Sequence, residues 1–538
     1  MSYCGEKVLT NPQKLFFLVF FSAVLPVFSE RYRISEITYE LDNTREKDLA
    51  RVVPVDKTRI FSSKEELDAY LTDLHQRIMN TRAFQSAEIE NFTSSDESDS
   101  ADGIAEEIIP VSLILKASDS KHLLILPYPK YDSNDGLIFK IKAKDVNFAG
   151  TMNTLNAGLF AGLKEDPETG RQNPTFGAEF DYSYPFYPGP FSASWNNSLD
   201  LQYTCNVNEL EFLSGTGFTF TLPFDRVSFV FDAKEKAGRD LDYEEYDDTQ
   251  YFTSDFCLSL PVKILEIDSW GPILWTPFAD AKVSYDKNGI SSENDDLASP
   301  VLSAGHSLST KRINWYGNFR SGFSVKIGHT IGYDFKQNET EPTFFGESQA
   351  FVAFKYMGMN LRFFGFVTKS NRSEIGDLIR GVRDKTRYLN AEQKKLFTSK
   401  ALKAPSALVL NMDFPIHIIT TSWLSWLNTL FGEESFLAEK LAWTDKFNFE
   451  LQLSPFLDIA LTKNEITGRL FSTKDGWYTG GIEVLVFPER WKGIVMRGSF
   501  GIDLGKALLS KKYPEKIDLS WRENVKKYEI YAGIGLHY

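Results

Sequence analysis

An arginine and two aspartates on separate segments are the residues of this chain best suited to a buried ion-pair site. Arg380 lies in a long polar segment, at about residues 371–404, between two stretches of alternating apolar and polar residues. Asp413 and Asp458 occupy polar positions in the next two alternating stretches. If the long segment folds toward them, its guanidinium can meet both carboxylates in charge-assisted hydrogen bonds. Gly381 would allow a tight backbone turn there, whereas a solvated Arg380 is the alternative.

The alternation indicates which of these side chains share a face. Successive side chains of a strand point to opposite sides, so residues two apart lie together. One stretch has its apolar positions at Phe447, Phe449, Leu451, Leu453 and Leu457. Asp458 therefore falls on the polar face of that strand, with Glu450 and Gln452. Asn411 and Asp413 fall on the polar face of the preceding strand in the same way.

No arrangement of residues in the sequence indicates an enzyme. A Gly-x-Ser-x-Gly nucleophile turn, a glycine-rich phosphate loop and a zinc-type Cys/His cluster are all absent from the sequence. The histidines are scattered along the chain, at His75, His122, His306, His329, His417 and His537. We therefore expect no catalytic residues, no metal ligands and no cofactor.

The composition combines many aromatic rings with a polar average. The 538 residues include 44 Phe, 23 Tyr and 10 Trp, yet the mean hydropathy is only −0.26. So many aromatic residues exclude disorder as the main state of the chain. The net charge of −14 argues against a nucleic-acid partner, because such domains normally present a basic surface.

The region from about residue 145 onward is a series of segments in which every second residue is apolar. One segment has Phe176, Ala178, Phe180, Tyr182, Tyr184 and Phe186 at alternate positions. The residues between them are small, polar or charged. Long segments of this kind with rings near both ends are typical of a transmembrane barrel, apolar toward lipid and polar toward the lumen. A soluble sandwich of two sheets is the alternative.

Counted back from the C-terminus, the segments predict an all-β barrel of 16 antiparallel strands over residues 145–538. An even number is expected of a bacterial single-chain barrel. The last predicted strand, 527–538, has one apolar face that ends in an aromatic ring. Ile530, Ile534, Leu536 and Tyr538 lie on this face and resemble the C-terminal signal by which outer-membrane barrels are assembled.

The first 29 residues indicate export. Lys7 and Lys14 precede a short apolar run that closes with small residues near Ser29. This order is typical of a secretory signal peptide, and the run is shorter than the roughly 20 apolar residues of a membrane anchor, which is the alternative. Of the cysteines that follow, Cys205 lies on the apolar face of its predicted strand and Cys257 on the polar face of another. Because these two side chains point to opposite sides of the predicted sheet, we do not expect them to form a disulfide.

Residues 30–117 predict a small α+β module unlike the rest of the chain. A strand over 32–41 precedes a short helix, and a longer helix begins after Ser62 and Ser63 with apolar residues at helical spacing. Two strands follow, over 84–92 and 108–115, separated by an acidic serine-rich stretch. The order strand, helix, helix, strand, strand resembles a polypeptide-transport-associated (POTRA) domain. A spacer with no client is the alternative.

Several short motifs resemble those of the BamA/TamA/FhaC superfamily, whose members join POTRA domains to a 16-stranded barrel. The long segment contains a match to the family's Val-Arg-Gly-Phe/Tyr motif, made of Ile379, Arg380, Gly381 and Val382. Residues 410–415 and 456–460 resemble the motifs of the next two strands, which carry Asp413 and Asp458. Residues 145–150 resemble the Asn-Phe-x-Gly entry to the first strand. Val382 and Ala460 depart from the family pattern, which has an aromatic residue and a glycine there.

The resemblance implies a function in inserting other barrels or moving polypeptides across the outer membrane. It implies outer-membrane lipids and unfolded outer-membrane or secreted polypeptides as partners, with periplasmic chaperones or accessory lipoproteins as further candidates. The implied localisation is a bacterial-type outer membrane, with the N-terminal module in the periplasm. A passive porin-like channel and a structural surface protein are the alternatives.

The predicted organisation is a signal peptide (1–29), a POTRA-like domain (30–117), a linker and barrel entry (118–144) and the barrel (145–538). One segment interrupts the strand series, from Trp423 to Leu441, with apolar residues at helical spacing. It suits an amphipathic helix at the membrane interface or against the barrel rim. A plain long loop with a short helix is the alternative.

Overall fold

The computed structural model describes residues 30–93, 108–132, 136–165, 171–206, 208–239, 250–267, 269–285, 300–369, 373–375, 378–381, 397–398, 401–432, 436–464, 466–522 and 527–538. The predicted signal peptide and Val382 lie outside these residues. The chain forms two compact units. The first comprises Met1–Tyr39, Val55–Leu74 and Ile89–Leu115, and the second comprises Glu40–Pro54, His75–Glu88 and Lys116–Tyr538.

The N-terminal part of the chain contains a four-stranded sheet and two helices. The strands are β1 (Arg31–Leu41), β2 (Ile60–Phe61), β3 (Phe84–Thr93) and β4 (Ile108–Asp119), in the order β2-β1-β4-β3. The helices are α2 (Glu46–Val52) and α3 (Lys64–Asn80). The predicted order of elements is observed, with the two-residue strand β2 as an addition.

The first unit has its own apolar core. Leu67, Leu71 and Leu74 of α3 are buried, as are Ile34 of β1 and Phe61 of β2. The helical residues lie three or four positions apart and therefore share one face of α3. This pattern confirms the amphipathic helix that the sequence predicts.

The start of α3 is held by a reciprocal cap. The Glu66 N–H donates to Ser63 Oγ at 3.3 Å, and Glu66 Oε2 accepts from the Ser62 N–H at 2.8 Å and from Ser62 Oγ at 2.7 Å. Arg59 Nη2 donates to Glu66 Oε1 at 2.9 Å. The Ser62 hydroxyl and the Arg59 guanidinium together lower the pKa of Glu66 to about 2.

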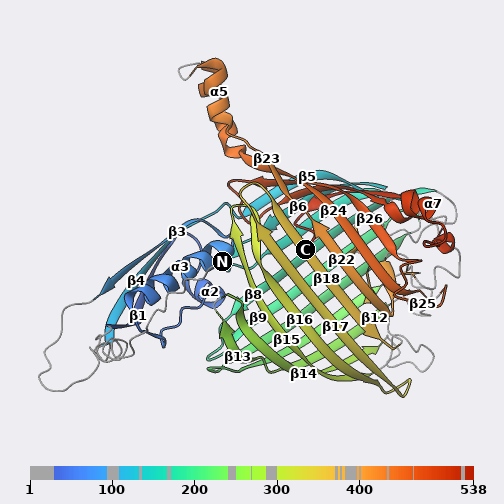
Figure 1. Ribbon diagram of the computed structural model, residues 1–538, viewed down its shortest axis with the longest axis horizontal. Coiled ribbons are helices and arrows are strands. Elements are labelled where there is room, and N and C mark those ends of the chain that lie inside the picture. Colours follow the sequence, from blue (N-terminus) through green and yellow to red (C-terminus); the bar gives the residue numbers. More distant parts are fainter. Residues whose placement is uncertain are drawn as a thin grey trace, which may run out of the picture. The chain divides into compact units, whose positions relative to one another are not determined.

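A barrel of antiparallel strands makes up most of the second unit (Figure 1). Its first strands are β5 (Leu123–Asp132), β6 (Gly136–Asp145), β7 (Leu155–Glu165), β8 (Gln172–Phe186), β9 (Ser192–Thr204), β10 (Glu209–Pro223), β11 (Ser228–Arg239), β12 (Gln250–Ser259) and β13 (Val262–Ile267). Next come β14 (Gly271–Tyr285), β15 (Val301–Tyr316), β16 (Phe319–Asp334), β17 (Glu339–Ala353) and β18 (Gly358–Thr368). The last are β22 (Ser406–Asp413), β23 (Ile416–Thr420), β24 (Phe449–Asn464), β25 (Arg469–Leu470), β26 (Trp477–Pro488), β27 (Met496–Asp503) and β28 (Tyr528–Ile534).

The strand order returns from β28 to β5, as in a closed barrel. Both β12 and β13 pair with β14, and both β22 and β23 pair with β24, so each of these couples is one interrupted strand. Without the two-residue β25, the barrel then has 18 strands among the described residues. The prediction of 16 is short by the hairpin of β5 and β6. Residues 118–144 are predicted as a linker and barrel entry, but they contain β5 and β6, and Ile138–Asp145 of β6 pairs with β7.

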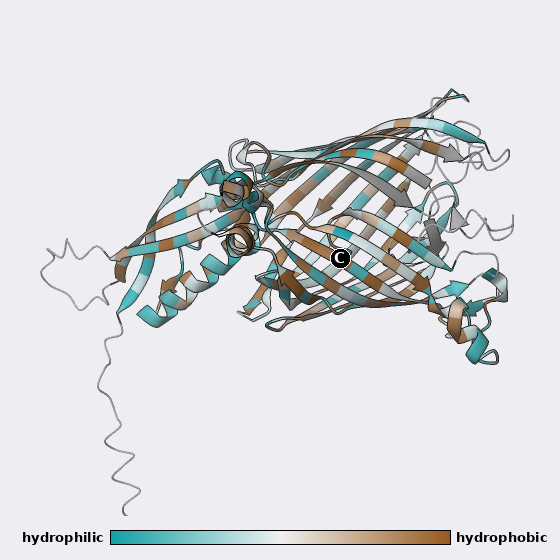
Figure 2. Ribbon diagram, turned by 90° about the horizontal axis from the view of Figure 1, so that it is seen from above, coloured by the Kyte–Doolittle hydropathy of each residue, from teal (hydrophilic) through white to brown (hydrophobic). Residues whose placement is uncertain are grey.

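The two faces of the wall follow the predicted alternation. On β24, Gln452, Ser454, Phe456 and Asp458 are buried on the lumen side, and the residues that alternate with them point outward. The outward rows include large exposed side chains such as Phe176 of β8 and Ile327 of β16. Apolar and polar residues therefore alternate along the strands (Figure 2).

The connections differ between the two ends of the barrel. At the end where the chain enters β5, which we name the entry end, short turns join the strands, as at 187–191, 317–318 and 354–357. At the opposite end, which we name the loop end, longer segments join β18 to β22 and β27 to β28. A segment with α5 (Trp423–Phe431), α6 (Phe436–Leu441) and the 3₁₀ stretch η4 (Ala442–Phe447) is a long exception at the entry end.

The remaining short elements belong to the loop-end segments and to one turn. They are β19 (Ser373–Glu374), β20 (Phe397–Thr398), β21 (Ala401–Ala404), α7 (Ser510–Lys512), the π-helical η5 (Gly505–Leu509), and the 3₁₀ turns η1 (Phe148–Gly150) and η6 (Ser520–Arg522). Strands β19, β21 and β20 form a separate small sheet. Within the described ranges, no helix has the length and apolar character needed to cross a membrane.

The cap of α3 yields a local stability prediction. We expect Ser63→Ala to cost about 1 kcal/mol, as is typical of removing an N-cap hydroxyl. This corresponds to about a 5-fold loss of hydrogen-exchange protection in the first turn of α3 in the full-length protein. Ser62→Ala on the adjacent residue, which also contacts Glu66, should cost less, because the backbone N–H of residue 62 still donates to the carboxylate. Equal protection in Ser63→Ala and the parent would contradict the cap.

Candidate functional site: a buried arginine in the barrel lumen

Arg380 is buried among carboxylates from the barrel wall. Its backbone N–H and its Nε both donate to Asp458 Oδ2 at 2.9 Å, and its Nη2 donates to Asp458 Oδ1 at 2.6 Å. Its Nη1 donates to Asp413 Oδ1. Asp458 lies on β24 and Asp413 on the neighbouring β22. The structure therefore brings together the three residues that the sequence singled out.

A third carboxylate and an aromatic ring complete the site. Glu483 Oε1 of β26 lies 3.4 Å from Arg380 Nη1 and 3.6 Å from Arg497 Nη1, so it is shared by two arginines. The guanidinium carbon of Arg380 lies 3.9 Å from the centre of the Phe456 ring. Alternation along β26 could have placed Glu483 on the lumen face, because the neighbouring Ile482 and Val484 point outward, but it does not show that Glu483 meets Arg380.

The backbone around Arg380 is held as closely as its side chain. Asn411 Nδ2 donates to the Leu378 carbonyl oxygen at 2.7 Å. Gly381 has a φ of +83°, and a Cβ there would lie 3.1 Å from the Gly501 carbonyl carbon of β27. A larger residue would meet both a strained backbone and the barrel wall. The segment that carries Arg380 is thus fixed to β22, β24, β26 and β27.

A second buried arginine, which the sequence analysis missed, holds the segment between β27 and β28. Arg522 donates from Nη1 to Asp503 Oδ2 at 2.5 Å and from Nη2 to the Gly476 carbonyl oxygen at 3.1 Å. Lys506 Nζ donates to the Arg522 carbonyl oxygen at 3.0 Å. The guanidinium carbon lies 3.8 Å from the centre of a Trp477 ring. Residues 504–527 have no strand periodicity, so nothing in the sequence indicated this contact.

One apolar cluster joins the two arginine-bearing segments. Trp477 and Trp521 pack edge to face, with ring centres 5.7 Å apart. The same cluster contains Ile375 and Ile379 from the Arg380 segment and Ala460 from β24. Because both segments bury apolar side chains in one core, loosening either segment exposes surface of the other.

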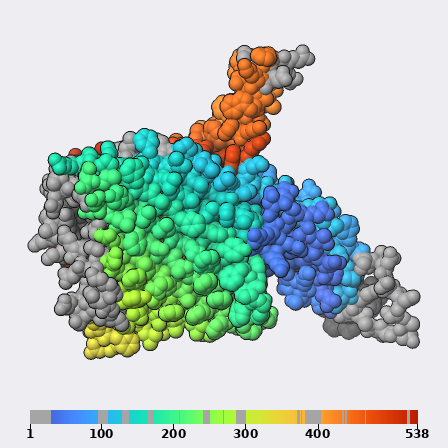
Figure 3. Space-filling model, turned by 180° about the vertical axis from the view of Figure 1, so that it is seen from behind, coloured from blue at the N-terminus to red at the C-terminus, as the bar shows by residue number. Residues whose placement is uncertain are grey.

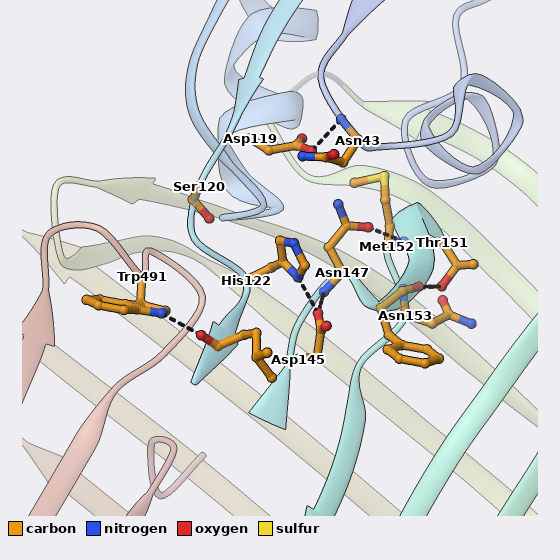
Figure 4. Close-up of polar contacts among 12 residues, drawn as sticks. Asn43, Asp119, Ser120, His122, Asp145, Asn147, Thr151, Met152, Asn153 and Trp491 are labelled. Carbon is orange, nitrogen blue, oxygen red and sulfur yellow. Dashed lines mark hydrogen bonds and ion pairs between the residues drawn. The ribbon is translucent and has the colours of Figure 1, made fainter. Parts of the chain in front are cut away.

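The Asn-Phe-Ala-Gly motif lies in the turn between β6 and β7 at the entry end, and not at the start of the first barrel strand. Asn147 follows β6 and is buried, and its Nδ2 donates to Thr44 Oγ1 at 2.7 Å. Its Oδ1 accepts from the Met152 N–H at 2.7 Å (Figure 4). Thr44 Oγ1 in turn donates to Asp119 Oδ1 at 2.7 Å. The Gly150 carbonyl oxygen accepts from the Arg45 N–H at 2.8 Å. The motif therefore ties residues 43–45 to the turn between β6 and β7.

Neighbouring contacts at the entry end join the first barrel strand to the turn after β26. His122 Nδ1 lies 2.7 Å from Asp145 Oδ1, and Trp491 Nε1 donates to the Leu123 carbonyl oxygen at 2.9 Å (Figure 4). The Lys121 N–H donates to the Arg490 carbonyl oxygen at 2.8 Å. The start of β5 and the end of β6 are thus both held in place at the entry end.

The C-terminal residues depart from the prediction that they share one face of a final strand. β28 ends at Ile534, so Leu536 and Tyr538 do not extend its exposed face, on which Ile530 lies. Leu536 packs against the buried cluster of Leu485, Phe487 and Val495. Tyr538 instead accepts from Arg320 Nη1 at its carbonyl oxygen, at 2.6 Å. These inward contacts turn the chain away from the strand direction.

The described residues contain no group of three or more His, Cys, Asp or Glu side chains placed to hold a metal ion. The carboxylates around Arg380 are instead occupied by arginine. Cys205, which follows β9, and Cys257 of β12 are both free thiols.

Comparisons with known proteins give similarities at low sequence identity. No protein-family model matches the sequence, and no curated protein matches it significantly. Among solved structures, BamA from Haemophilus ducreyi lacking POTRA domains 1–3 has a TM-score of 0.39 and 9% identity, over 93% of this chain and 84% of that one.

CdiB structures from two organisms are similar to a comparable degree. CdiB from Acinetobacter baumannii has a TM-score of 0.46 and 9% identity, over 93% of this chain and 73% of that one. CdiB from Escherichia coli has a TM-score of 0.36 and 6% identity, over 94% of this chain and 91% of that one. Because all three TM-scores lie below 0.5, we base the functional proposal on the contacts of the chain itself.

Removing the Arg380 side chain should destabilise the barrel strongly. Arg380→Ala leaves Asp413, Asp458 and Glu483 buried together without their main cation, and breaking such an ion pair typically costs about 3–5 kcal/mol. We expect this loss in thermal unfolding of the folded barrel in detergent, followed by its heat-dependent migration on a gel. A double variant with Arg380→Met and Asp458→Asn should be more stable than Arg380→Met alone, because the second substitution removes one uncompensated buried charge.

Two arginines serve as controls for this substitution. Arg383→Ala changes a neighbouring arginine, which lies outside the described residues. Arg362→Ala removes an arginine of β18 whose Nε bonds one carboxylate, Glu347 Oε1, at 2.7 Å. Both should cost clearly less than Arg380→Ala, and equal costs for Arg380→Ala and Arg383→Ala would refute the assignment.

The Trp477–Trp521 contact should couple the two loop-end segments. Trp521→Ala removes a large ring from the shared core, a change that typically costs about 3–5 kcal/mol. We expect faster hydrogen exchange both in residues 504–522 and in residues 378–381. Trp443→Ala, at an exposed ring of η4, is the matched control. Faster exchange confined to residues 504–522 would show that the segments are independent.

Proposed function

We propose that this chain is an outer-membrane β-barrel protein that inserts other barrels or moves polypeptides across the outer membrane. It acts without catalysis, metal or cofactor. The observation that carries the proposal is the burial of Arg380 between Asp413 and Asp458, at the positions where the superfamily motifs match.

The distribution of contacts supports a role for the seam between β28 and β5. The segment that carries Arg380 is fixed to strands β22 through β27, which stiffens that side of the wall. The closing strand β28 has only seven residues, and the chain then turns inward. A short strand pairing costs less to open than a long one, and an opened edge can pair with an extended client.

The N-terminal module is proposed to be a POTRA-like periplasmic domain comprising residues 30–117. Its sheet has β3 at one edge, to which an extended segment of a client could add. The clients would be unfolded outer-membrane or secreted polypeptides, with periplasmic chaperones or accessory lipoproteins as helpers. The short turns at the entry end and the longer loop-end segments are typical of an outer-membrane barrel with its entry end toward the periplasm.

Site-specific crosslinking tests this function. A photoreactive residue at Ile125 of β5 or Ile530 of β28 lies on the exposed face beside the seam, whereas one at Ile327 of β16 lies on the exposed face elsewhere. We expect crosslinks to newly exported polypeptides from the two seam positions and few from Ile327. Depletion of the protein should also lower the amounts of its client barrels in the outer-membrane proteome.

The alternatives predict different results. A porin would conduct small solutes, tolerate deletion of residues 31–117 and leave other barrels unchanged on depletion. A structural surface protein would give no client crosslinks at any of the three positions. Either set of results would overturn the proposed function.

A further inference from the structure

A helical segment at the entry end presents an apolar surface that the barrel itself does not cover. None of the residues of α5 is buried. The exposed large side chains are Leu424, Trp426, Leu430 and Phe431 of α5, Phe436 of α6, and Trp443 and Phe447 of η4. Leu430 is 75% exposed and Phe436 is 71% exposed. Exposing this much apolar surface of a short segment to water is unfavourable.

The helix α5 is amphipathic. Trp423, Trp426, Leu427 and Leu430 lie three or four residues apart and form one stripe. The opposite side carries Ser425, Asn428 and Thr429, which are small, polar and uncharged. This arrangement suits a helix with one face in an apolar medium and the other among polar groups.

The base of the segment is fixed to the barrel wall. Trp423 Nε1 donates to the Phe447 carbonyl oxygen at 3.3 Å, and the Trp423 N–H donates to Asn448 Oδ1 at 3.0 Å. The Thr421 N–H donates to the Phe449 carbonyl oxygen at 2.9 Å. The helix therefore starts at a defined height of the barrel, where β24 begins.

The surface continues the outward face of the wall. β23 leads into α5, and its exposed Ile416 and Ile419 pair with Leu453 and Leu451 on the outward face of β24. From there α5 leaves the wall sideways instead of following the strands (Figures 1 and 3). The exposed Tyr356 lies beside this strand, because its carbonyl oxygen accepts from the His417 N–H at 2.8 Å.

We propose that residues 423–447 bind the phospholipid bilayer, with α5 lying in the interface of the leaflet at the entry end. This inference rests on the proposed function, because it needs the barrel to span a membrane. A helix that leaves sideways at the end of the strands runs along the membrane surface. Its apolar stripe then enters the acyl region, and tryptophan rings lie at the level they prefer. Continuity with the outward row of β23 favours lipid over a protein partner as the occupant.

Fluorescence quenching by brominated lipids tests the proposal. Single cysteines are placed at Leu430 on the apolar stripe, at Thr429 on the polar side and at Ile327 on the outward face of β16, in full-length protein with Cys4, Cys205 and Cys257 changed to serine. Each is labelled with an environment-sensitive nitrobenzoxadiazole dye. The proteins are reconstituted in phosphatidylcholine–phosphatidylglycerol vesicles with and without brominated acyl chains. We expect about a 2-fold quenching at Leu430 and Ile327 and much less at Thr429.

Each other result is informative. Quenching at Ile327 without quenching at Leu430 would overturn the lipid contact of α5 while leaving the barrel intact. A blue-shifted Leu430 probe that bromine does not quench would mean that protein covers the helix, which also overturns the inference. Equal quenching at Thr429 and Leu430 would refute the interfacial orientation. No quenching at any position would instead contradict the membrane-spanning barrel and with it the proposed function.

Discussion

Burying a guanidinium is the constraint around which the lumen of this barrel is organised. A charge removed from water is costly unless it is paired and hydrogen-bonded. Arg380 meets this condition with carboxylates from three wall strands, and the backbone beside it is held by Asn411 and by close contact between Gly381 and Gly501. Since those partners lie on β22, β24, β26 and β27, the same contacts that neutralise Arg380 also fix the registers of these strands relative to the long segment.

The two ends of the barrel are stabilised by different kinds of contact. At the loop end, Arg522 and Arg380 hold two long segments, and the tryptophan pair joins these into one core. At the entry end, side-chain hydrogen bonds around Asn147 hold a tight turn, and most neighbouring turns are short. The segment with α5 stands apart because its exposed apolar residues need an external partner. The two described loop-end segments thus pack into a common core, whereas the segment with α5 leaves apolar surface exposed.

Much of this architecture follows from local pattern. Because side chains alternate along a strand, apolar residues at every second position predict both the strand and its outward face, and the placement of Asp413 and Asp458 on the lumen face follows. The β5–β6 hairpin was assigned to a linker although Phe139 and Ile141 alternate with Lys140 and Lys142. Pro127 lies within β5, although proline cannot donate a ladder hydrogen bond. Its place in the first strand, at the seam of the barrel, is where such a residue is tolerated best.

The sequence by itself determined the class of fold, the two faces of the wall and the residues that could pair with Arg380. Only the tertiary structure decided that Glu483 is a third carboxylate partner, that Arg522 fixes a second segment, and that Leu536 and Tyr538 turn inward. The physical reason is that alternation is a property of neighbours along the chain. The partners of a residue in a long loop or a chain end depend instead on which strands come together across the barrel and in what register. Residues without periodicity, such as 504–527, therefore acquire their contacts only when the whole wall is in place.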